Sequence, residues 1–184
     1  MFLNPAKIIA DLDLRPGMKV ADFGCGSGHF TGEMARRVGR SGIVYTFDIQ
    51  KEVLEALKSK LLVEGITNAQ FSRVDLEKEK GTGLADSLVD FVLISNSLFQ
   101  MEDKGAAIRE AFRILRPGGK IAAVEWKLSV VGIGPPPSLR TGEEDLRALF
   151  SGAGFEFLKS FDAGDSHYGM AFIKPDTGVY KKVF

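Results

Sequence analysis

The sequence predicts a single α/β domain with a doubly wound sheet and helices on both faces. Short apolar runs alternate with amphipathic stretches, which is typical of parallel strands joined by helices in right-handed crossovers. The run VDFVLISN at 89–96 is almost continuously apolar, as expected of a strand that helices cover on both faces. With 184 residues, 45% of them hydrophobic, the chain is long enough for one domain with its own core.

The spacing of the apolar residues places the elements along the chain. Strands are expected at 19–23, 42–48, 69–75, 89–96, 120–126, 155–164 and 167–175, and helices at 1–14, 31–39, 51–65, 103–115 and 141–155. Gly65 should cap the helix at 51–65, and the residues RPGG at 116–119 should end the next helix. Thr141 and Glu144 have the spacing of a capping box. A short turn separates the last two strands, so we expect them to be antiparallel to each other.

The composition narrows the class of protein. Lys and Arg total 24, as do Asp and Glu, so the formal net charge is zero and no nucleic-acid partner is expected. The one cysteine, Cys25, excludes a disulfide framework and a thiolate cluster within the chain, and no metal site is expected. No apolar run approaches the roughly 20 residues of a transmembrane segment. The N-terminus lacks a signal-peptide pattern, so we expect a cytoplasmic location.

A cluster of glycines follows the first predicted strand. In VADFGCGSGHF, at 20–30, three glycines occupy five positions, and Asp22 lies two residues before the first of them. Between a strand and a helix, such a turn directs backbone N–H groups and the positive helix end at a ligand. The segment therefore predicts a nucleotide or nucleoside site, although an ordinary strand-to-helix turn explains the glycines equally well at this point.

Polar residues also end the next three predicted strands. Asp48 lies 20 residues beyond Gly28, the spacing of an acid that accepts ribose hydroxyls, although it would also serve as a helix N-cap. Asp75 ends the third strand, either as an acceptor for an adenine amino group or as a plain turn residue. The fourth strand ends at Ser-Asn-Ser, residues 95–97. Open α/β sheets bind ligands at the carboxyl ends of their strands, so four such ends together favour a ligand site.

Taken in order, these segments resemble the class I S-adenosylmethionine-dependent methyltransferases, in the style of the small-molecule group that includes the ubiquinone and menaquinone biosynthesis methyltransferases. The resemblance rests on VADFGCGSGHF, FDI, RVD, DFVLISN and RILRPGGKIAAVEW and covers roughly residues 15–174. It implies a Rossmann-like sheet of seven strands in which only the last is antiparallel. It also implies S-adenosylmethionine as the cofactor, S-adenosylhomocysteine as its product and a small molecule as the methyl acceptor.

The resemblance assigns cofactor-binding residues by position. They are Asp22, Gly24, Cys25, Gly26, Gly28, Asp48, Ile49, Asp75, Leu76, Ser95 and Asn96. The glycines would lie against the methionine part of the cofactor, and Asp22 would reach its amino group directly or through water. Asp48 would hold the ribose, Ile49 would pack on the adenine, and Asp75 would meet the adenine amino group. Ser95 and Asn96 would face the methionine end and the acceptor.

No sequence motif identifies the residues that act on the acceptor, so they are proposed from their positions. Candidate catalytic residues are His29, Asn96 and His167, although capping or positional roles are equally open for the histidines. The acceptor side is expected to include Phe99, Met101, Trp126, Pro135 and His167, with ordinary core packing as the alternative for the aromatic residues. Cys25 is more typical of a small buried residue than of a catalytic thiol.

The segment KLSVVGIGPPPSLR at 127–140 is longer than an ordinary connection and contains three successive prolines. We expect residues 132–140 to form a wall or lid of the acceptor site, with hinges at Gly132 and Gly134. A structural crossover to the next helix is the alternative. The single domain 1–184 then divides into an N-terminal helix (1–14), a cofactor-binding half (15–125), an acceptor-side loop (126–140) and a C-terminal helix with a strand hairpin (141–184).

The predicted activity is methyl transfer by in-line displacement. The leaving group of a sulfonium is already activated, so the protein mainly supplies alignment and exclusion of water. A general base is required only where the acceptor loses a proton. Two alternatives stay open: a protein that binds S-adenosylmethionine without catalysis, and an NAD-dependent oxidoreductase. The spacing G-x-G-x-G, with His29 in place of the last glycine of the dinucleotide fingerprint, disfavours the oxidoreductase.

Overall fold

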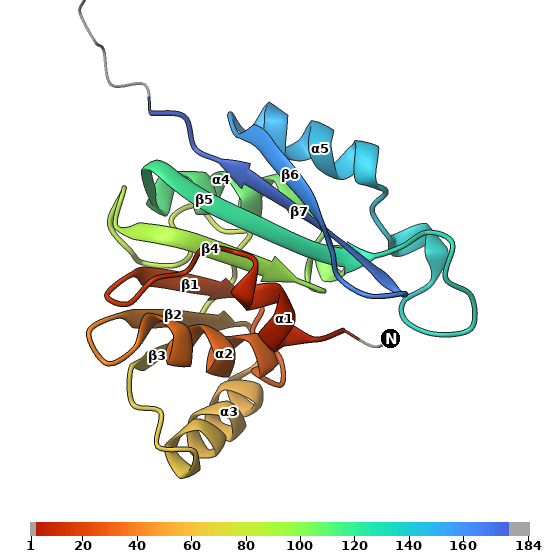
Figure 1. Cartoon of the computed structure of the whole chain (residues 1–184). Coiled ribbons are helices and arrows are strands. Elements are labelled where there is room, and N and C mark those ends of the chain that lie inside the picture. Colours follow the sequence, from red (N-terminus) through yellow and green to blue (C-terminus); the bar gives the residue numbers. More distant parts are fainter. Residues whose placement is uncertain (1–2, 177–184) are drawn as a thin grey trace, which may run out of the picture.

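The computed structural model describes residues 3–176, which form a seven-stranded sheet in the order β3-β2-β1-β4-β5-β7-β6 (Figure 1). The strands are β1 (Lys19–Phe23), β2 (Ile43–Asp48), β3 (Ala69–Arg73), β4 (Val89–Ser95), β5 (Leu115–Trp126), β6 (Glu156–Asp162) and β7 (His167–Ile173). β7 is antiparallel to both β5 and β6, and the other pairings are parallel. The predicted sheet with an antiparallel last strand is confirmed.

Helices cover both faces of this sheet. They are α1 (Pro5–Ala10), α2 (His29–Val38), α3 (Lys51–Val63), α4 (Lys104–Ile114) and α5 (Glu143–Gly152). Successive residues of a strand point to opposite faces, and Val92 and Leu93 of β4 show this clearly. Val92 packs in a core with α4 and α5, whereas Leu93 packs in a core with α1 and α2. The continuous apolar run of this strand is therefore explained by burial on both sides.

The strand order creates a switch point beside β1, which pairs with β2 on one side and with β4 on the other. The chain runs from β1 through β2 to β3 on one side and then returns to β4 on the other side. The loops after β1 and β4 therefore diverge, toward α2 on one face and α4 on the other. In open parallel sheets the crevice outside the carboxyl ends of the strands at such a point is the usual ligand site. The predicted site residues follow these strand ends.

Several predicted boundaries need correction. α2 begins at His29, two residues earlier than expected, because Gly28 already adopts the left-handed conformation that precedes the helix. The N-terminal helix expected at 1–14 is reduced to α1. Residues 116–119 end α4 as predicted, but they belong to β5, whose register with β4 shifts between Val89 and Phe91. Gly65 follows the end of α3 with a φ of 72°, as expected of a C-terminal glycine.

The capping box predicted at Thr141 and Glu144 is wrong. α5 begins at Glu143 with Gly142 as its N-cap, and no side chain caps this described helix. Thr141 is fixed through its carbonyl oxygen, which accepts a hydrogen bond from the Tyr168 hydroxyl at 2.7 Å. Thr141 precedes the N-cap and so lies outside the first turn of the helix.

Residues 1–2 of the predicted first unit and 177–184 of the predicted last unit lie outside the described residues. Among the helices that the structure does describe, none is long and apolar enough to cross a membrane.

Candidate functional site

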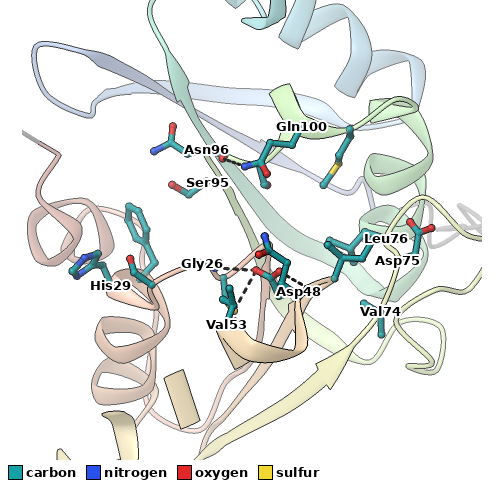
Figure 2. A pocket seen from close by; sticks show the side chains of 18 of the residues that line it. Gly26, His29, Asp48, Val53, Val74, Asp75, Leu76, Ser95, Asn96 and Gln100 are labelled. Atoms are coloured by element: carbon teal, nitrogen blue, oxygen red, sulfur yellow. Dashed lines mark hydrogen bonds between the residues drawn. The ribbon is translucent and has the colours of Figure 1, made fainter. Parts of the chain in front are cut away.

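A cavity of about 370 Å³ lies at the carboxyl ends of β1 to β4 (Figure 2). Its volume falls within the roughly 300–1,000 Å³ that is typical of small-molecule sites. Ten of the residues singled out from the sequence line it: Gly24, Cys25, Gly26, His29, Asp48, Ile49, Asp75, Leu76, Ser95 and Asn96. Met101, expected on the acceptor side, also lines it. Four separate strand ends thus meet in one cavity, as predicted.

Further lining residues were not singled out from the sequence. They are Leu3, Ser27, Phe30, Gln50, Val53, Val74, Glu77 and Gln100, and Ser97 lines the cavity as part of the segment 95–97. Most of them lie within a few positions of a predicted site residue, so including the residues that flank each strand end would have identified them. Leu3 carries no signal of this kind, because only the packing of the N-terminal segment brings it to the cavity.

The three glycines of the loop after β1 have left-handed φ values of 74°, 48° and 74° at Gly24, Gly26 and Gly28. A Cβ atom at Gly24 would lie 2.6 Å from Ser97 Cβ, and one at Gly28 would overlap Leu57 Cδ1. Gly28 does not line the cavity, whereas a Cβ atom at Gly26 would meet nothing within 4 Å. Gly24 and Gly28 are therefore required by backbone conformation and by the packing of the protein itself.

The backbone N–H groups of this loop are largely paired within the protein. Those of Gly24 and Cys25 donate to Phe47 O at 2.9 and 3.0 Å, and that of Gly28 donates to Cys25 O at 2.9 Å. The Gly26 N–H donates to Asp48 Oδ2 at 3.1 Å. This arrangement fixes the loop against the end of β2. It differs from the expected display of free N–H groups, because four of them are already committed.

Asp48 lies in the middle of the cavity wall, with Gly26 and Val53 beside it (Figure 2). Its Oδ1 accepts from Gln50 N at 3.0 Å, while Oδ2 accepts from Gly26 N. α3 begins at Lys51 with Gln50 as its N-cap, so the N-cap alternative for Asp48 is wrong. Each carboxylate oxygen has more than one lone pair, which leaves acceptor capacity for a ligand.

Asp22 lies outside the cavity lining, in the buried end of β1. Its Oδ2 accepts from the Thr31 hydroxyl at 2.5 Å, which ties β1 to the first turn of α2. Burial raises the pKa of Asp22 to about 6, partly offset by the Thr31 hydrogen bond. The structure thus gives Asp22 a role in joining the strand to the helix, and direct contact with a ligand stays a prediction.

Cys25 lines the cavity but does not carry a reactive thiolate. Its Sγ lies 3.8 Å from Asp48 Oδ2. Burial, together with the charges of Asp22 and Asp48, raises the pKa of the thiol well above its ordinary value. A thiol held in this way is a poor nucleophile.

The turn after β4 presents an unpaired polar atom. Asn96 has a φ of 52°, a conformation that residues other than glycine seldom adopt. Its side-chain oxygen, Oδ1, is buried and has no hydrogen-bond partner among the residues that the structure describes. Asn96 lines the cavity, next to Ser95 (Figure 2). Strain and an unpaired buried acceptor in one residue are features that cluster at functional sites.

Glu125 holds the turn after β4 through a hydrogen bond. It is buried at the end of β5, and its Oε1 accepts from Leu98 N at 3.3 Å. The Ser97 hydroxyl donates to Phe23 O at 3.1 Å, which anchors the same turn to β1. Burial raises the pKa of Glu125 to about 7, although N–H donors from the turn and Lys104 oppose the shift. Sequence reasoning did not single out this residue.

The other end of the cavity is mainly apolar. Val74, Asp75 and Leu76 lie together there, opposite Gln100 (Figure 2). Ile49 lines the cavity with 58% of its surface exposed, so it offers an apolar face that a flat ligand would cover. Asp75 Oδ1 accepts from Glu77 N at 3.0 Å, so the residue serves its turn and still lines the cavity.

Most residues expected on the acceptor side lie elsewhere. Phe99, Trp126, Pro135 and His167 do not line the cavity. The Trp126 and His167 rings contact each other, with centroids 4.2 Å apart. Burial lowers the pKa of His167 to about 4, aided by Lys127 and Arg140. Trp126 of β5 and His167 of β7 thus pack against each other rather than on the cavity, and a role at the acceptor site stays a prediction for these four residues.

Known proteins share both the sequence pattern and the fold. The sequence profile of a methyltransferase domain family matches residues 14–136. The chain belongs to this methyltransferase domain family. A ubiquinone/menaquinone biosynthesis C-methyltransferase from Vibrio vulnificus is 34% identical over 117 residues, which are 63% of this chain and 44% of that protein. This methyltransferase chain therefore spans less than half of the length of that curated relative.

Solved structures agree at the level of the fold. A methyltransferase from Aquifex aeolicus, described as dependent on S-adenosylmethionine, superposes with a TM-score of 0.86 at 24% identity, covering 94% of this chain and 90% of that one. A protein named the [4+2]-cyclase SpnF superposes with a TM-score of 0.78 at 20% identity, covering 92% and 79%. The predicted class I methyltransferase fold, and S-adenosylmethionine as the cofactor of the family, are confirmed.

Proposed function

We propose that this chain transfers a methyl group from S-adenosylmethionine to a small-molecule acceptor by in-line displacement in the cavity of Figure 2. When bound, the cofactor supplies a methyl group on a sulfonium, whose leaving group is already activated. The observation that carries the proposal is the convergence of four strand ends on one cavity. That cavity joins an apolar face, a carboxylate and an unpaired amide oxygen.

The residues present suit the cofactor. At the apolar end, Ile49 and Leu76 would cover the two faces of a purine, and the Asp75 carboxylate would accept from its amino group. Asp48 would accept hydrogen bonds from the ribose hydroxyls with the lone pairs that Gln50 and Gly26 leave open. A carboxylate is a strong acceptor for neutral donors.

The unpaired Asn96 Oδ1 supports the assignment of the amino-acid end. A buried acceptor without a partner costs free energy, so a ligand N–H group there would relieve that cost. We assign this atom to the ammonium group of the cofactor. Glu125 and Ser97 would act indirectly, because they hold the turn in which Asn96 lies.

The acceptor would lie where His29, Phe30, Gln100 and Met101 line the cavity. These side chains mix one ionisable ring with apolar groups and an amide, which suits a small, largely apolar molecule. The relative's name favours a ring of the quinol type. His29 is exposed at the first position of α2 and is placed to take a proton from such an acceptor. The remaining residues would align the acceptor and exclude water.

The paired loop supports this cofactor over a dinucleotide. A pyrophosphate is held by free N–H groups at a glycine-rich turn. Here the N–H groups of Gly24, Cys25, Gly26 and Gly28 already donate within the protein. We also propose that the protein acts in the cytoplasm and that nucleic acid is not its substrate, since its formal net charge is zero.

A turnover assay tests the proposal. The purified chain would be incubated with S-adenosylmethionine carrying a labelled methyl group and a panel of quinols, phenols, amines and thiols. We expect labelled product and S-adenosylhomocysteine with at least one ring-type acceptor, and a large loss of turnover in Asn96→Ala. Cofactor binding without transfer to any acceptor class would favour the alternative of a binding protein.

A further inference from the structure

The loop at 127–140, here called the Arg140 loop, stands out beyond the ends of β5 and β7 at the side of the molecule (Figure 1). Half of the exposed large apolar side chains in residues 3–176 belong to it. They are Leu128 (54% exposed), Val131 (90%), Ile133 (51%) and Leu139 (48%). Such a concentration of apolar side chains on one projecting segment is typical of an interaction surface.

The loop is held together by one buried guanidinium. Arg140 Nη1 donates to Lys127 O at 2.9 Å and to Val130 O at 2.6 Å, and Nη2 donates to Ile133 O at 2.8 Å. Its Nε donates to Pro135 O at 2.9 Å. The loop therefore closes around its last residue, and its shape does not depend on a partner.

Two further contacts fix the loop to the sheet. The Arg140 guanidinium lies 5.6 Å from the centre of the Trp126 ring. A Cβ atom at Gly134 would lie only 2.7 Å from Trp126 Cε3, so this glycine permits close packing. The structure thus shows a loop that is packed onto the end of β5, and hinges at Gly132 and Gly134 stay a prediction.

This construction satisfies several polar backbone groups from inside the loop. Four carbonyl groups are satisfied from inside by Arg140, and the three prolines at 135–137 have no N–H group to satisfy. A loop of this kind can enter a medium of low polarity without stranding those groups, which would otherwise oppose entry. Protein interfaces, by contrast, usually exchange about one hydrogen bond per 100–200 Å².

The surroundings of the loop carry negative charge. The exposed acids Glu143, Glu144 and Asp145 follow it directly at the start of α5, and they line a hollow beside Leu128. Lys127 lines the same hollow and its Nζ donates to Gly164 O at 2.9 Å, so the hollow holds one positive and three negative side chains. The rim thus complements the cationic group of a zwitterionic lipid and would repel an anionic lipid surface.

We propose that the Arg140 loop docks the protein on the interfacial layer of a zwitterionic lipid bilayer. The apolar side chains enter the layer, and the acids at the start of α5 face the cationic headgroups. The loop follows the carboxyl end of β5, the edge of the sheet at which the cavity also lies. The docking does not depend on the proposed methyl transfer, because no residue of the loop lines the cavity.

Co-sedimentation of the full chain with phosphatidylcholine vesicles tests the proposal. We expect Val131→Asp/Ile133→Asp to lower the partition coefficient about tenfold or more, since two apolar contacts become charged. The matched control is Val63→Asp at the end of α3, because Val63 is also 90% exposed. We expect the control to change partition less than twofold, and both variants to keep the denaturation midpoint of the parent.

Fluorescence gives an independent measurement, because Trp126 is the only tryptophan in the chain and lies against the loop. We expect vesicles of brominated phosphatidylcholine to quench the parent, and to quench the double variant far less. Equal quenching of both would overturn the proposal. So would binding that requires anionic lipid, or an absence of vesicle binding together with self-association that the double variant abolishes. Affinity for S-adenosylhomocysteine, measured in parallel, reports on the cofactor site separately.

Discussion

Two regions lie at the edge of the sheet where the parallel strands end, and they are built differently. The first region is the cavity at the ends of β1 to β4, and the second comprises the ends of β5 and β7 with the Arg140 loop. At β1 to β4, Gly24, Asp48, Asp75 and Asn96 each lie within two residues of their own strand, and all four line one cavity. At β5 and β7, Trp126 and His167 also end or begin a strand, but they pack against each other. The sheet topology thus determines where a residue at the end of a strand lies, whereas the position of a long loop depends on its tertiary contacts.

The largest expected effect concerns the glycine loop that anchors the first region. A Cβ atom in Gly28→Ala would overlap Leu57 in a left-handed backbone, so we expect the free energy of unfolding to fall by about 3 kcal/mol. Gly26→Ala is the matched control: it has the same backbone hand but open space, and should cost about 1 kcal/mol. Chemical denaturation measures both.

A further pair of variants separates packing from conformation. In a Leu57→Ala background the overlap is removed, so Gly28→Ala should cost distinctly less than in the parent. An equal cost in both backgrounds would contradict the packing explanation and leave only the backbone.

The second prediction concerns the carboxylate in the cavity. We expect Asp48→Ala to weaken binding of S-adenosylhomocysteine by about 1.5–3 kcal/mol, as charge-assisted hydrogen bonds are lost. Asp75→Ala should cost less than about 1 kcal/mol, because the Asp75 side chain is 35% exposed and water can replace the lost hydrogen bond, whereas Asp48 is buried. Calorimetry on the folded variants measures both. If the two variants lose the same affinity, or Asp48→Ala loses none, the ribose assignment fails.

The third prediction concerns Glu125, the buried carboxyl group that accepts a hydrogen bond from the turn after β4. The pKa of Glu125 is raised to about 7 from an ordinary value of 4.5, so its protonated form is favoured in the folded state. The resulting stability is present below about pH 4.5 and is lost as pH rises through 7. Between pH 5 and pH 8 the parent should therefore lose about 2 kcal/mol more than Glu125→Gln.

Denaturation at both pH values measures this difference. The buried Asp22, with its pKa raised to about 6, adds a similar loss at lower pH, but it is present in both proteins and cancels. Parallel pH profiles for the parent and Glu125→Gln would show that Glu125 keeps its ordinary pKa.

The smallest expected effect on cofactor affinity comes from changes in the second region, which contains the Arg140 loop. Replacing Pro135, Pro136 and Pro137 with Gly-Ser-Gly should change affinity for S-adenosylhomocysteine by less than about twofold, because none of them lines the cavity. The emission of Trp126 should shift in the same variant, since the loop packs on that ring. A cofactor affinity that falls with the emission shift would mean that the two regions are coupled.

Sequence patterns were informative wherever one strand and its next residues decide the outcome. The alternation of elements, the burial of β4 on both faces and the meeting of Asp48, Asp75 and Asn96 all follow from a parallel sheet with a switch point. Glu125 was missed, because its role depends on a neighbouring strand. The loop at 127–140 does not line the cavity, because Arg140 draws the carbonyl groups of its loop together, a contact that no local pattern indicates. Its role as a wall or lid of the acceptor site stays a prediction.

Calorimetric titration of the parent chain with S-adenosylhomocysteine and, separately, with NAD tests the central claim most directly. The geometry predicts saturable binding of one S-adenosylhomocysteine per chain and no heat from NAD, because four N–H groups of the loop after β1 already donate within the protein. Binding of NAD with no heat from S-adenosylhomocysteine would contradict the assignment of the cavity to a methyltransferase cofactor.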